Sequence, residues 1–447
     1  MEDVPELARI AVNGGTAAQL QAAPVPSHYL AAYLSRDDHV PENGVAPDVR
    51  DTIRVGMVPM PRLAPDEVLV AVMASGINYN TVWSALGQPV STFRFLSQFA
   101  TKGQWAARHD LPTQVIGSDA SGIIVRVGEA VTAWSVGDHV VVHPVVVDPQ
   151  DPASYQDGML AADQRAWGFE TNFGGLAHFC VARTHQLLPK APHLTWEEAA
   201  VNTLCATTAY RMLVSDHGAR MRQGDIVLIW GAAGGLGCYA VQLVRNGGGI
   251  AVGVVGSPAK VELLRKAGCD VVIDRSELPS GQDEPEIMAK AIGRAIRRAV
   301  GEDPHIVFDH VGQETFAASV FLARRGGTVV TCGSSTGYMH SFDNRYLWMR
   351  LKRIVGCHGA NYQEAWETNR LLTLGRLMPA MSSVFTLHEA ADAARLVQLN
   401  RHTGKVAVLS LASQEGLGVQ DSEARKRIGE DRLRIFRDLA LTAKEIS

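Results

Sequence analysis

The sequence predicts an α/β protein in which a doubly wound parallel sheet follows a β-rich domain. First, apolar runs alternate with helical stretches and glycine-rich turns between residues 206 and 355, which is typical of a parallel sheet covered on both faces. Second, short β-branched runs separated by glycine and aspartate fill residues 67–147, which favours a twisted antiparallel sheet or partial barrel. Third, 447 residues are too many for one ordinary hydrophobic core.

These patterns divide the chain into three segments. Residues 1–205 are expected to form the first part of the β-rich domain, residues 206–355 the parallel-sheet domain, and residues 356–447 a return to the first domain. Thr195, followed by Glu197 and Glu198, predicts the helix start that precedes the parallel sheet. The final stretch, SEARKRIGEDRLRIFRDLALTAKEIS, reads as one charge-laced amphipathic helix on the surface or at a subunit contact.

Composition excludes several classes of protein. Apolar residues make up 46% of the chain and charged residues 20%, which is typical of a globular protein rather than a disordered one. Lys and Arg total 42 against 46 Asp and Glu, so no overall basic field attracts nucleic acid or an anionic membrane. Local arginine clusters can still bind a small polyanion.

Cysteine use and the first residues favour the cytoplasm. The start, MEDVPELARIAV, lacks the basic and apolar regions of a signal peptide, and no apolar run approaches the roughly 20 residues that span a bilayer. The six cysteines contain no CxxC pair, so we expect reduced thiols instead of disulfides or structural zinc. They are Cys180, Cys205, Cys238, Cys269, Cys332 and Cys357.

A glycine-rich loop gives the strongest local signal for a binding site. It follows the apolar run DIVLIW and precedes the helical stretch YAVQLVRNGG, as in a Rossmann-type dinucleotide site. Small residues there let a pyrophosphate approach the backbone, although a tightly packed strand–helix turn is the alternative. The candidate contacts are Gly231, Ala233, Gly234, Gly235, Leu236 and Gly237.

The choice of cofactor is predicted from residues about twenty positions further along. NAD sites typically place a carboxylate there, whereas this chain has Gly-Ser-Pro-Ala-Lys at residues 256–260. Ser257 and Lys260, with Arg275 nearby, suit a 2′-phosphate, so NADPH is the expected cofactor. Cys332 and Gly333 follow a later strand with the same strand-to-glycine pattern and are further candidate cofactor contacts.

This domain order resembles the medium-chain dehydrogenase/reductase superfamily, whose β-rich catalytic domain is GroES-like. Zinc alcohol dehydrogenases of that superfamily have a cysteine in the loop after the second strand and a later Gly-His-Glu. Here the loop reads Gly-Ile-Asn-Tyr-Asn-Thr at residues 76–81, and the later site reads Gly-Ser-Asp at residues 117–119. These residues cannot provide a converging set of zinc ligands, so no metal is expected. The chain is similar to the zinc-independent branch, which reduces activated double bonds.

Four longer motifs resemble crotonyl-CoA carboxylase/reductases. They are INYNTVW at residues 77–83, WGFETNFGGLA at 167–177, NRYLWMRLKRIVG at 344–356 and HGANYQEAWETNR at 358–370. The resemblance implies NADPH-dependent reduction of a 2-enoyl-CoA coupled to capture of CO2, which gives an alkylmalonyl-CoA for polyketide synthesis. It also implies a homotetramer built as a dimer of dimers.

The resemblance implies four catalytic residues that surround CO2: Asn80, Phe169, Glu170 and His358. In this hypothesis Asn80 and His358 donate hydrogen bonds to oxygens of CO2 and of the new carboxylate. Glu170 fixes a water or a neighbouring group, and Phe169 excludes bulk water. Each residue also has a structural interpretation: a turn asparagine, a core phenylalanine, a solvated glutamate or a structural histidine.

The resemblance also implies the substrate contacts. Arg345 and Tyr346 match residues at the CoA site, although an exposed helix is the alternative. Gly359 stands where members acting on crotonyl-CoA tend to have a bulky aromatic residue, and Ala161 and Ala162 are also small. We therefore expect a longer acyl chain, such as hexenoyl- or octenoyl-CoA.

Two other functions remain open at this point. An enoyl-CoA or quinone reductase that only transfers hydride needs no CO2 pocket, so dependence on bicarbonate separates it from a carboxylase. A structural protein that binds NADPH without catalysis is the second alternative, which NADPH oxidation with any enoyl-CoA excludes.

Overall fold

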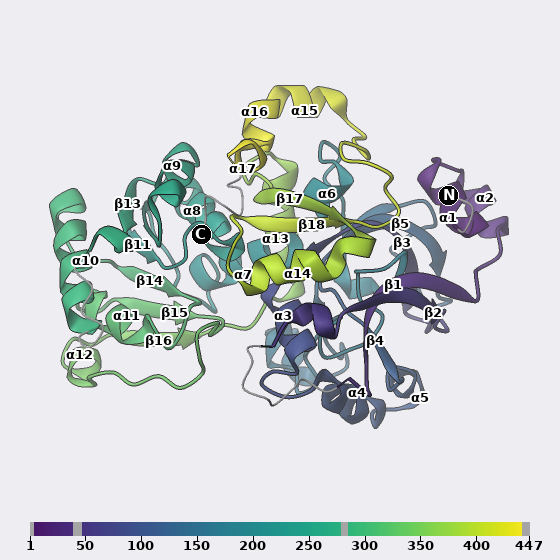
Figure 1. The fold of residues 1–447 in the computed structure, drawn as a ribbon, viewed down its shortest axis with the longest axis horizontal. Helices are drawn as coiled ribbons and strands as arrows, with labels where there is room; N and C mark the ends of the chain where they lie inside the picture. Colours follow the sequence, from purple (N-terminus) through teal and green to yellow (C-terminus); the bar gives the residue numbers. More distant parts are fainter. Residues whose placement is uncertain (1–3, 39–46, 279–284, 440–447) are drawn as a thin grey trace.

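The structure is a computed structural model that describes residues 4–38, 47–278 and 285–439. It has two lobes side by side, a parallel-sheet lobe and a β-rich lobe, and the later part of the chain returns between them (Figure 1). The predicted fold class, a doubly wound parallel sheet beside a β-rich domain, is confirmed.

The parallel-sheet lobe contains six strands in the order β13-β12-β11-β14-β15-β16, and every neighbouring pair is parallel. The central strand β11 is apolar and buried at every position, as expected where helices cover both faces. The strands are β11 (Ile226–Ile229), β12 (Ile250–Val255), β13 (Val271–Asp274), β14 (Ile306–Asp309), β15 (Thr328–Thr331) and β16 (Arg353–Gly356), and the helices are α8 (Gly235–Asn246), α9 (Pro258–Lys266), α10 (Pro285–Val300), α11 (Phe316–Leu322) and α12 (Arg345–Trp348).

The β-rich lobe is built around β3 (Glu67–Ile77), which is buried at all eleven of its positions. It belongs to a seven-stranded sheet in which β3 pairs with β5, β9 and β18. The other strands are β5 (Ala120–Val127), β6 (His139–Val142), β9 (Phe179–Arg183), β10 (Leu187–Pro189), β17 (Met381–Thr386) and β18 (Lys405–Leu409). Because β17 and β18 come from the last part of the chain, the return segment completes this sheet.

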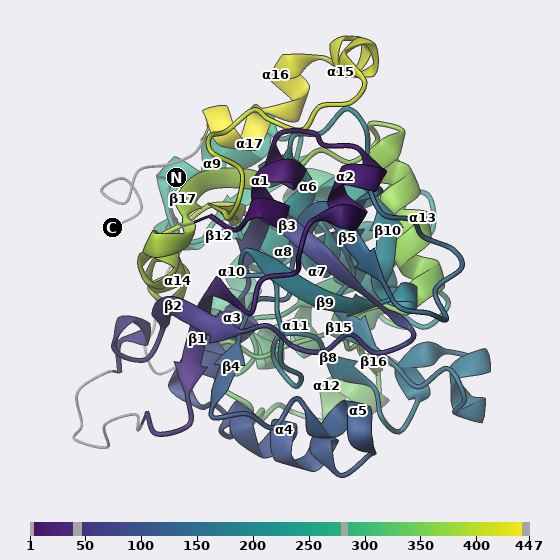
Figure 2. The same cartoon turned by 90° about the vertical axis from the view of Figure 1, so that its right-hand side faces the viewer.

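Smaller elements cover the β-rich lobe. A three-stranded sheet is formed by β1 (His28–Ser35), β2 (Arg54–Pro59) and β4 (Thr113–Val115), and β7 (Val145–Val146) pairs with β8 (Arg165–Ala166). Helices α1 and α2 lie at one end of the lobe (Figure 2), where Leu7 of α1 is completely buried. The helices are α1 (Glu6–Val12), α2 (Ala17–Ala22), α3 (Tyr79–Leu86), α4 (Thr92–Ala100), α5 (Gln104–Ala107) and α14 (Ala390–Gln398).

The first helix between the lobes begins where the sequence predicts. Thr195 caps α6 (Trp196–Ala200): its Oγ1 accepts from Glu198 N at 3.3 Å, and its N donates to Glu198 Oε2 at 3.0 Å. This capping box confirms the predicted helix start. The next helix, α7 (Thr203–Leu213), packs against both α8 and α13 (Tyr362–Thr373), which joins the two lobes.

The prediction of one continuous C-terminal helix is wrong. The described part of that segment forms three short helices, α15 (Ser422–Ile428), α16 (Glu430–Leu433) and α17 (Ile435–Asp438), and residues 440–447 lie outside the described chain. Gly429 has a φ of +98°, which ends the first helix. Phe436, only 2% exposed, packs into the core beside α7 and α8, so this segment is anchored by burial instead of lying fully solvated.

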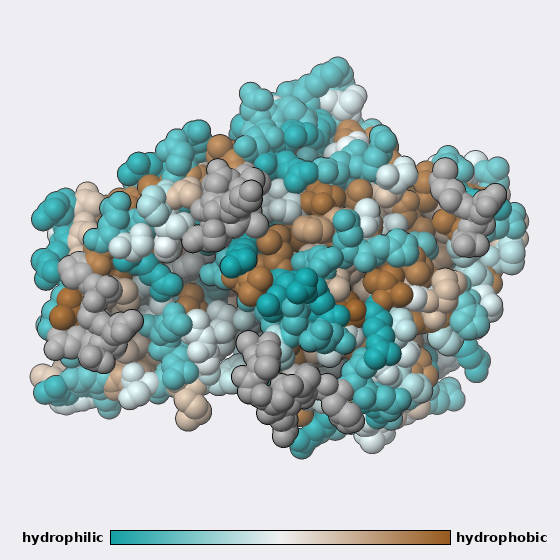
Figure 3. All heavy atoms as spheres, in the orientation of Figure 1, coloured by the Kyte–Doolittle hydropathy of each residue, from teal (hydrophilic) through white to brown (hydrophobic). Residues whose placement is uncertain are grey.

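Across the described ranges, no helix combines the length and apolarity needed to cross a membrane. On the face seen in Figure 3, hydrophilic residues cover most of the surface, with groups of hydrophobic residues between them.

Candidate active site

The glycine-rich loop joins β11 to α8 at the carboxyl end of the central strand. Gly231 has a φ of +59°, which favours glycine. A Cβ on Gly237 would lie 2.4 Å from the carbonyl oxygen of Gly231, so no larger residue fits there. Helix α8 begins directly after Gly234, and its first backbone N–H groups lack partners within the helix. This arrangement fits a bound pyrophosphate.

Ser257, Lys260 and Arg275 form a second polar cluster near the end of β12. Ser257 precedes α9, and its buried Oγ has no hydrogen-bond partner in the described chain. Burial lowers the pKa of Lys260, and the nearby Arg275 guanidinium lowers it further. None of the described carboxylates forms an ion pair with Lys260, while Arg275 lies 3.9 Å from Glu314. An anion would satisfy all three groups, so the cluster fits the 2′-phosphate of NADPH.

Cys332 and Gly333 follow β15, at the same edge of the sheet as the glycine-rich loop. Burial raises the pKa of the Cys332 thiol, which keeps it neutral. Thr331 Oγ1 donates to the carbonyl oxygen of Gly333 at 3.3 Å. Their place at the carboxyl ends of the strands agrees with a cofactor contact, which remains a prediction.

Asn80 lies in the first turn of α3 and is held by Ser118. Asn80 Nδ2 donates to Ser118 Oγ at 2.8 Å, and Ser118 Oγ donates to the carbonyl oxygen of Trp167 at 2.7 Å. Because the hydroxyl hydrogen points to Trp167, Ser118 accepts from Asn80, which orients the amide. Asn80 Oδ1 is then a buried acceptor with no partner in the described residues. A donor from a ligand or a water would satisfy it.

Phe169 and Glu170 lie just after β8 in a loop held by backbone contacts. Gln114 Nε2 donates to the carbonyl oxygen of Phe169 at 2.8 Å, and the Phe169 ring lies 5.9 Å from that of Phe95. Glu170 Oε2 accepts from Ala166 N at 2.8 Å. One carboxylate oxygen of Glu170 therefore accepts a hydrogen bond within its own loop, and the other is available to bind a water or a neighbouring group.

His358 is exposed, and its Nδ1 lies 3.0 Å from Gln164 Oε1. A carbonyl oxygen only accepts, so this contact assigns the proton to Nδ1. In the neutral ring Nε2 is then an acceptor, and donation by Nε2 to a carboxylate requires the protonated imidazole.

Residues 164–170 connect the four predicted catalytic residues. This segment contains Phe169 and Glu170. Ser118, which accepts from Asn80, donates to the carbonyl oxygen of Trp167, and His358 Nδ1 donates to Gln164 Oε1. The segments that contain Asn80, Ser118 and His358 therefore meet at residues 164–170, although the catalytic roles remain predictions.

Arg345 and Tyr346 lie in α12, at the outer end of the parallel-sheet lobe (Figure 1). The Arg345 side chain is 76% exposed and forms an ion pair with Asp343 at 2.6 Å. The Tyr346 ring packs edge-on against Phe321 at 4.9 Å. An exposed arginine with one carboxylate partner is compatible with both CoA binding and the surface-helix alternative, so CoA binding remains a prediction.

The surroundings of Gly359 are bounded by two side chains. A Cβ on Gly359 would lie 3.1 Å from Val145 Cγ2 and 3.4 Å from Met159 Cε, and its φ is +59°. Ala161 is buried, whereas Ala162 is exposed and donates its N–H to Asp151 Oδ2 at 2.8 Å. An acyl chain beside Gly359 would therefore contact Val145 and the flexible Met159 side chain.

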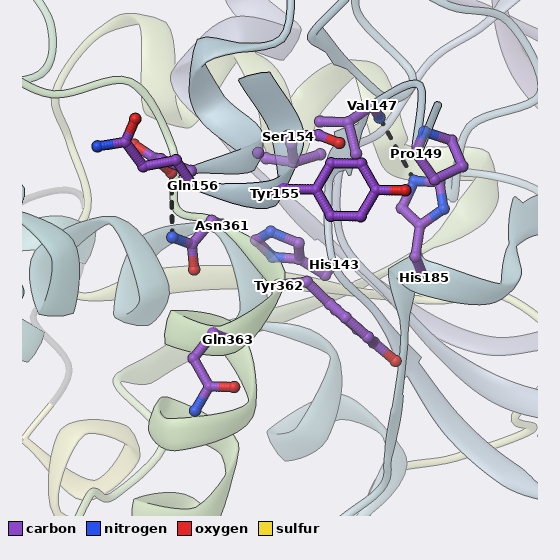
Figure 4. Close-up of a pocket in the computed structure, with 13 residues that line it drawn as sticks. His143, Val147, Pro149, Ser154, Tyr155, Gln156, His185, Asn361, Tyr362 and Gln363 are labelled. Atoms are coloured by element: carbon purple, nitrogen blue, oxygen red, sulfur yellow. Dashed lines mark hydrogen bonds between the residues drawn. The ribbon is translucent and has the colours of Figure 1, made fainter. Parts of the chain in front are cut away.

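A cavity of about 250 Å³ adjoins this region, between the loop after β6 and the start of α13 (Figure 4). It shares Val145 with the surroundings of Gly359. Burial lowers the pKa of the lining His143 to about 4 and that of His185 to about 3, so both rings are neutral near pH 7. The cavity wall is thus polar but uncharged at the two imidazoles.

Lys405 and Asp119 form a buried ion pair that no sequence motif indicated, with an Nζ–Oδ2 distance of 3.0 Å. The loops at residues 76–81 and 117–119, which lack the zinc ligands of alcohol dehydrogenases, meet at this lysine. A lysine at the start of a strand has no local signature, so only the folded structure reveals it. No group of three or more His, Cys, Asp or Glu that could hold a metal occurs among the residues described.

Comparisons with known proteins identify the family of this chain. The family model of the alcohol dehydrogenase GroES-like domain matches residues 64–192, and that of the zinc-binding dehydrogenase matches residues 235–373. A crotonyl-CoA reductase of Streptomyces collinus is 49% identical over 92% of this chain and 94% of its own length. The crotonyl-CoA carboxylase/reductase of Cereibacter sphaeroides is 38% identical over 88% of this chain and 90% of its own. This chain belongs to the crotonyl-CoA carboxylase/reductase family.

A solved structure shows the same relationship within that family. The 2-octenoyl-CoA carboxylase reductase CinF of a Streptomyces species, in complex with NADP and 2-octenoyl-CoA, is 58% identical to this chain. The match covers 98% of this chain and all of CinF, with a TM-score of 0.95. The resemblance that the four sequence motifs indicated is therefore confirmed at the level of the family.

Replacement of Lys260 by methionine tests the cofactor cluster. We expect Lys260→Met to raise KM for NADPH by about tenfold or more, because a hydrogen bond to a charged group contributes roughly 1.5–3 kcal/mol. KM for NADH should change little. The lowered pKa of Lys260 also predicts that KM for NADPH in the unmodified protein rises as the pH is raised through that pKa, since the neutral amine no longer attracts phosphate.

Lys266→Met is the matched control, because Lys266 is on the same helix but is 52% exposed and pairs with Glu262. Steady-state kinetics with both cofactors provide the measurement. Equal changes for NADPH and NADH in Lys260→Met would contradict the assignment.

Proposed function

We propose that the protein catalyses NADPH-dependent reductive carboxylation of a 2-enoyl-CoA to an alkylmalonyl-CoA that serves as a polyketide extender unit. The observation that supports this most strongly is the 58% identity over 98% of the chain to a 2-octenoyl-CoA carboxylase reductase bound to NADP and 2-octenoyl-CoA. The unsatisfied cluster at Ser257 and Lys260 supports NADPH as the cofactor.

The chemistry requires control of one reactive carbon. When bound, NADPH supplies the hydride that adds to the β-carbon of the enoyl thioester. The electron pair of the double bond then forms an enolate, whose α-carbon attacks CO2 to form a carbon–carbon bond and a carboxylate. If a proton reaches the α-carbon first, the product is the saturated acyl-CoA. The site must therefore position CO2 and exclude water.

In our proposal, four residues of this chain position CO2 and exclude water. The second N–H of Asn80 Nδ2, which is not used by Ser118, donates to an oxygen of CO2. His358 in its protonated form donates from Nε2 to the forming carboxylate, while Gln164 holds Nδ1. Phe169 forms an apolar wall, and the free oxygen of Glu170 fixes an ordered water or a neighbouring group.

Mass spectrometry of the product tests the proposed reaction. Incubation with NADPH, (E)-2-octenoyl-CoA and bicarbonate should give a product heavier than octanoyl-CoA by one carboxyl group, and omission of bicarbonate should abolish that mass. If octanoyl-CoA forms at the same rate in both reactions and no heavier product appears, the protein is a reductase without carboxylation. If NADPH is not consumed with any enoyl-CoA, the structural alternative holds.

We also propose that the preferred acyl chain is longer than crotonyl. Gly359, without a side chain, leaves Val145 and Met159 as the lining at this point. A phenylalanine there would direct its ring toward the space that these side chains border. A residue with a Cβ at this positive φ costs roughly 1–2 kcal/mol, so the backbone effect must be measured separately.

Two substitutions at Gly359 make that separation. Gly359→Ala adds the Cβ and the backbone cost, and we expect it to lower kcat/KM for octenoyl-CoA and crotonyl-CoA by the same factor. Gly359→Phe adds the ring, and we expect kcat/KM to fall further for octenoyl-CoA than for crotonyl-CoA. An equal loss for both substrates in Gly359→Phe would refute the proposed chain-length role.

We further propose a homotetramer, a dimer of dimers, in the cytoplasm. Strand β16 is an edge of the parallel sheet and pairs on one side with β15. Three large apolar residues near it are exposed: Trp348 by 61%, Leu351 by 65% and Ile354 by 38%. Exposed edges and apolar groups of this kind favour pairing with a second copy. The unpaired thiols of the described chain suit a reducing compartment.

The double variant Trp348→Glu/Leu351→Glu tests this edge. We expect light scattering to give four times the chain mass for the unmodified protein and half of that or less for the variant. Met57→Glu, at a 57% exposed apolar position on β2, is the control and should leave the mass unchanged. An unchanged mass in the double variant would contradict the role of this edge.

A further inference from the structure

Lys405 is a buried ammonium group whose hydrogen bonds are all satisfied. It begins β18, and its side chain is 3% exposed. Its Nζ donates to the carbonyl oxygen of Ile77 at 2.9 Å, to Asn78 Oδ1, and to Asp119 Oδ2 at 3.0 Å. An ammonium has three N–H groups, so this set uses each of them. The three acceptors come from two segments, the end of β3 with the start of α3 and the turn before β5.

The Asp119 carboxylate is equally well satisfied. It is completely buried, and its Oδ1 accepts from Thr203 Oγ1 at 2.6 Å and from Leu204 N at 2.9 Å. Its Oδ2 accepts from Asn78 Nδ2 at 2.8 Å as well as from Lys405. Burial alone would lower the pKa of Lys405, but the interactions with Asp119 and with the neighbouring Cys205 together outweigh that effect and raise it. Lys405 is therefore charged near pH 7.

The residues that contact Lys405 are direct neighbours of the Asn80–Ser118 pair. Asn78 precedes Asn80 by two positions at the start of α3, and Asp119 follows Ser118. The ammonium thus fixes both backbone segments on which the 2.8 Å bond between Asn80 and Ser118 depends. Loss of the ammonium would leave Asn78 Oδ1 without that donor and Asp119 without its counter-charge, so both segments would shift.

The same lysine also contacts the glycine-rich loop. A Cβ on Gly235 would lie 2.8 Å from Lys405 Cδ, so the lysine side chain packs directly against this glycine. The preceding residue, Gly404, donates its N–H to the carbonyl oxygen of Ala233 at 2.8 Å. Lys405 therefore connects the loop that would hold the cofactor with the loop that contains Asn80.

We propose that Lys405 is a positioning residue for carboxylation, which sets the place of Asn80 relative to the bound cofactor and so determines whether the enolate is captured by CO2 or by a proton. This inference rests on the proposed function. The competition between the two fates depends on small displacements, because a misplacement of about 1 Å can reduce a rate by roughly 100-fold. Hydride transfer, which needs the glycine-rich loop and the substrate, is less dependent on Asn80.

The test measures the ratio of carboxylated to reduced product at saturating NADPH and bicarbonate, with the thermal unfolding midpoint of each variant. We expect Lys405→Met to lower the ratio by about tenfold or more, in line with the effect of small misplacements on rate. Total NADPH oxidation should fall by a smaller factor. Lys405→Arg retains the positive charge, but the larger guanidinium cannot donate to the same three acceptors in the same geometry. Its product ratio should therefore lie between those of the unmodified protein and Lys405→Met.

The double variant Lys405→Met/Asp119→Asn separates positioning from stability. Removal of both buried charges should restore much of the unfolding midpoint that either single change loses, since no charge remains unpaired. The product ratio should stay low, because Ile77 and Asn78 still lack the ammonium donor. A ratio that recovers together with the midpoint would overturn the proposal. If Lys405→Met does not fold, Lys405→Arg and the double variant are compared instead.

Arg425→Met is the matched control. Arg425 forms a largely buried ion pair with Glu198 at 2.6 Å, in the segment that contains α15, and it contacts none of the residues that contact Lys405. We expect a lower unfolding midpoint and an unchanged product ratio. A fall in the ratio equal to that of Lys405→Met would overturn the proposal. If the unmodified protein forms only saturated acyl-CoA, the proposed function fails and this inference fails with it; if it carboxylates and all variants keep its ratio, only the inference fails.

Discussion

The antiparallel pairing of β18 with β3 is the contact on which the candidate site depends. It aligns Val406 with Ile77 and Leu409 with Ala74, and thereby brings Lys405 to the end of β3, where the chain turns into α3. Strand β3 is buried throughout and also pairs with β5 and β9, so it provides a rigid base for the loop that contains Asn80. The return of the chain after the parallel sheet is therefore necessary for the site, because it supplies both a strand and a cation.

Two lysines at this site, Lys405 and Lys260, differ in how their positive charge is balanced. Lys405 is buried with a carboxylate and two further acceptors, so its charge is balanced within the protein. Lys260 lies beside Arg275 and the unpartnered Ser257 hydroxyl and forms no ion pair with a carboxylate of the described residues, so a bound anion would balance its charge. Buried charges are stable when they are paired. Lys405 therefore maintains the shape of the site, and Lys260 is available for a ligand.

Local patterns predicted much of this arrangement. Apolar runs such as Ile226–Ile229 indicated the buried parallel strands, the Thr195 capping box marked a helix start, and the family motifs indicated the loops that meet at residues 164–170. The broken C-terminal segment was not predicted, since Gly429 and the burial of Phe436 override a helical charge pattern. The role of Lys405 was not predictable either. Its partners lie 286 to 328 positions away, and a separation of that size leaves no periodicity in the sequence.

The segment at residues 161–170 contains Ala161 and Ala162, predicted beside the acyl chain, as well as Phe169 and Glu170, predicted beside CO2. Ala161 and Phe169 are eight positions apart. Between them, the Gln164 side chain accepts a hydrogen bond from His358, and the carbonyl oxygen of Trp167 accepts one from Ser118. Selection for a different chain length at one end of this segment therefore also acts on the chemistry at its other end. An engineered enzyme with a wider substrate range should consequently need compensating changes around Phe169 to retain its carboxylation efficiency.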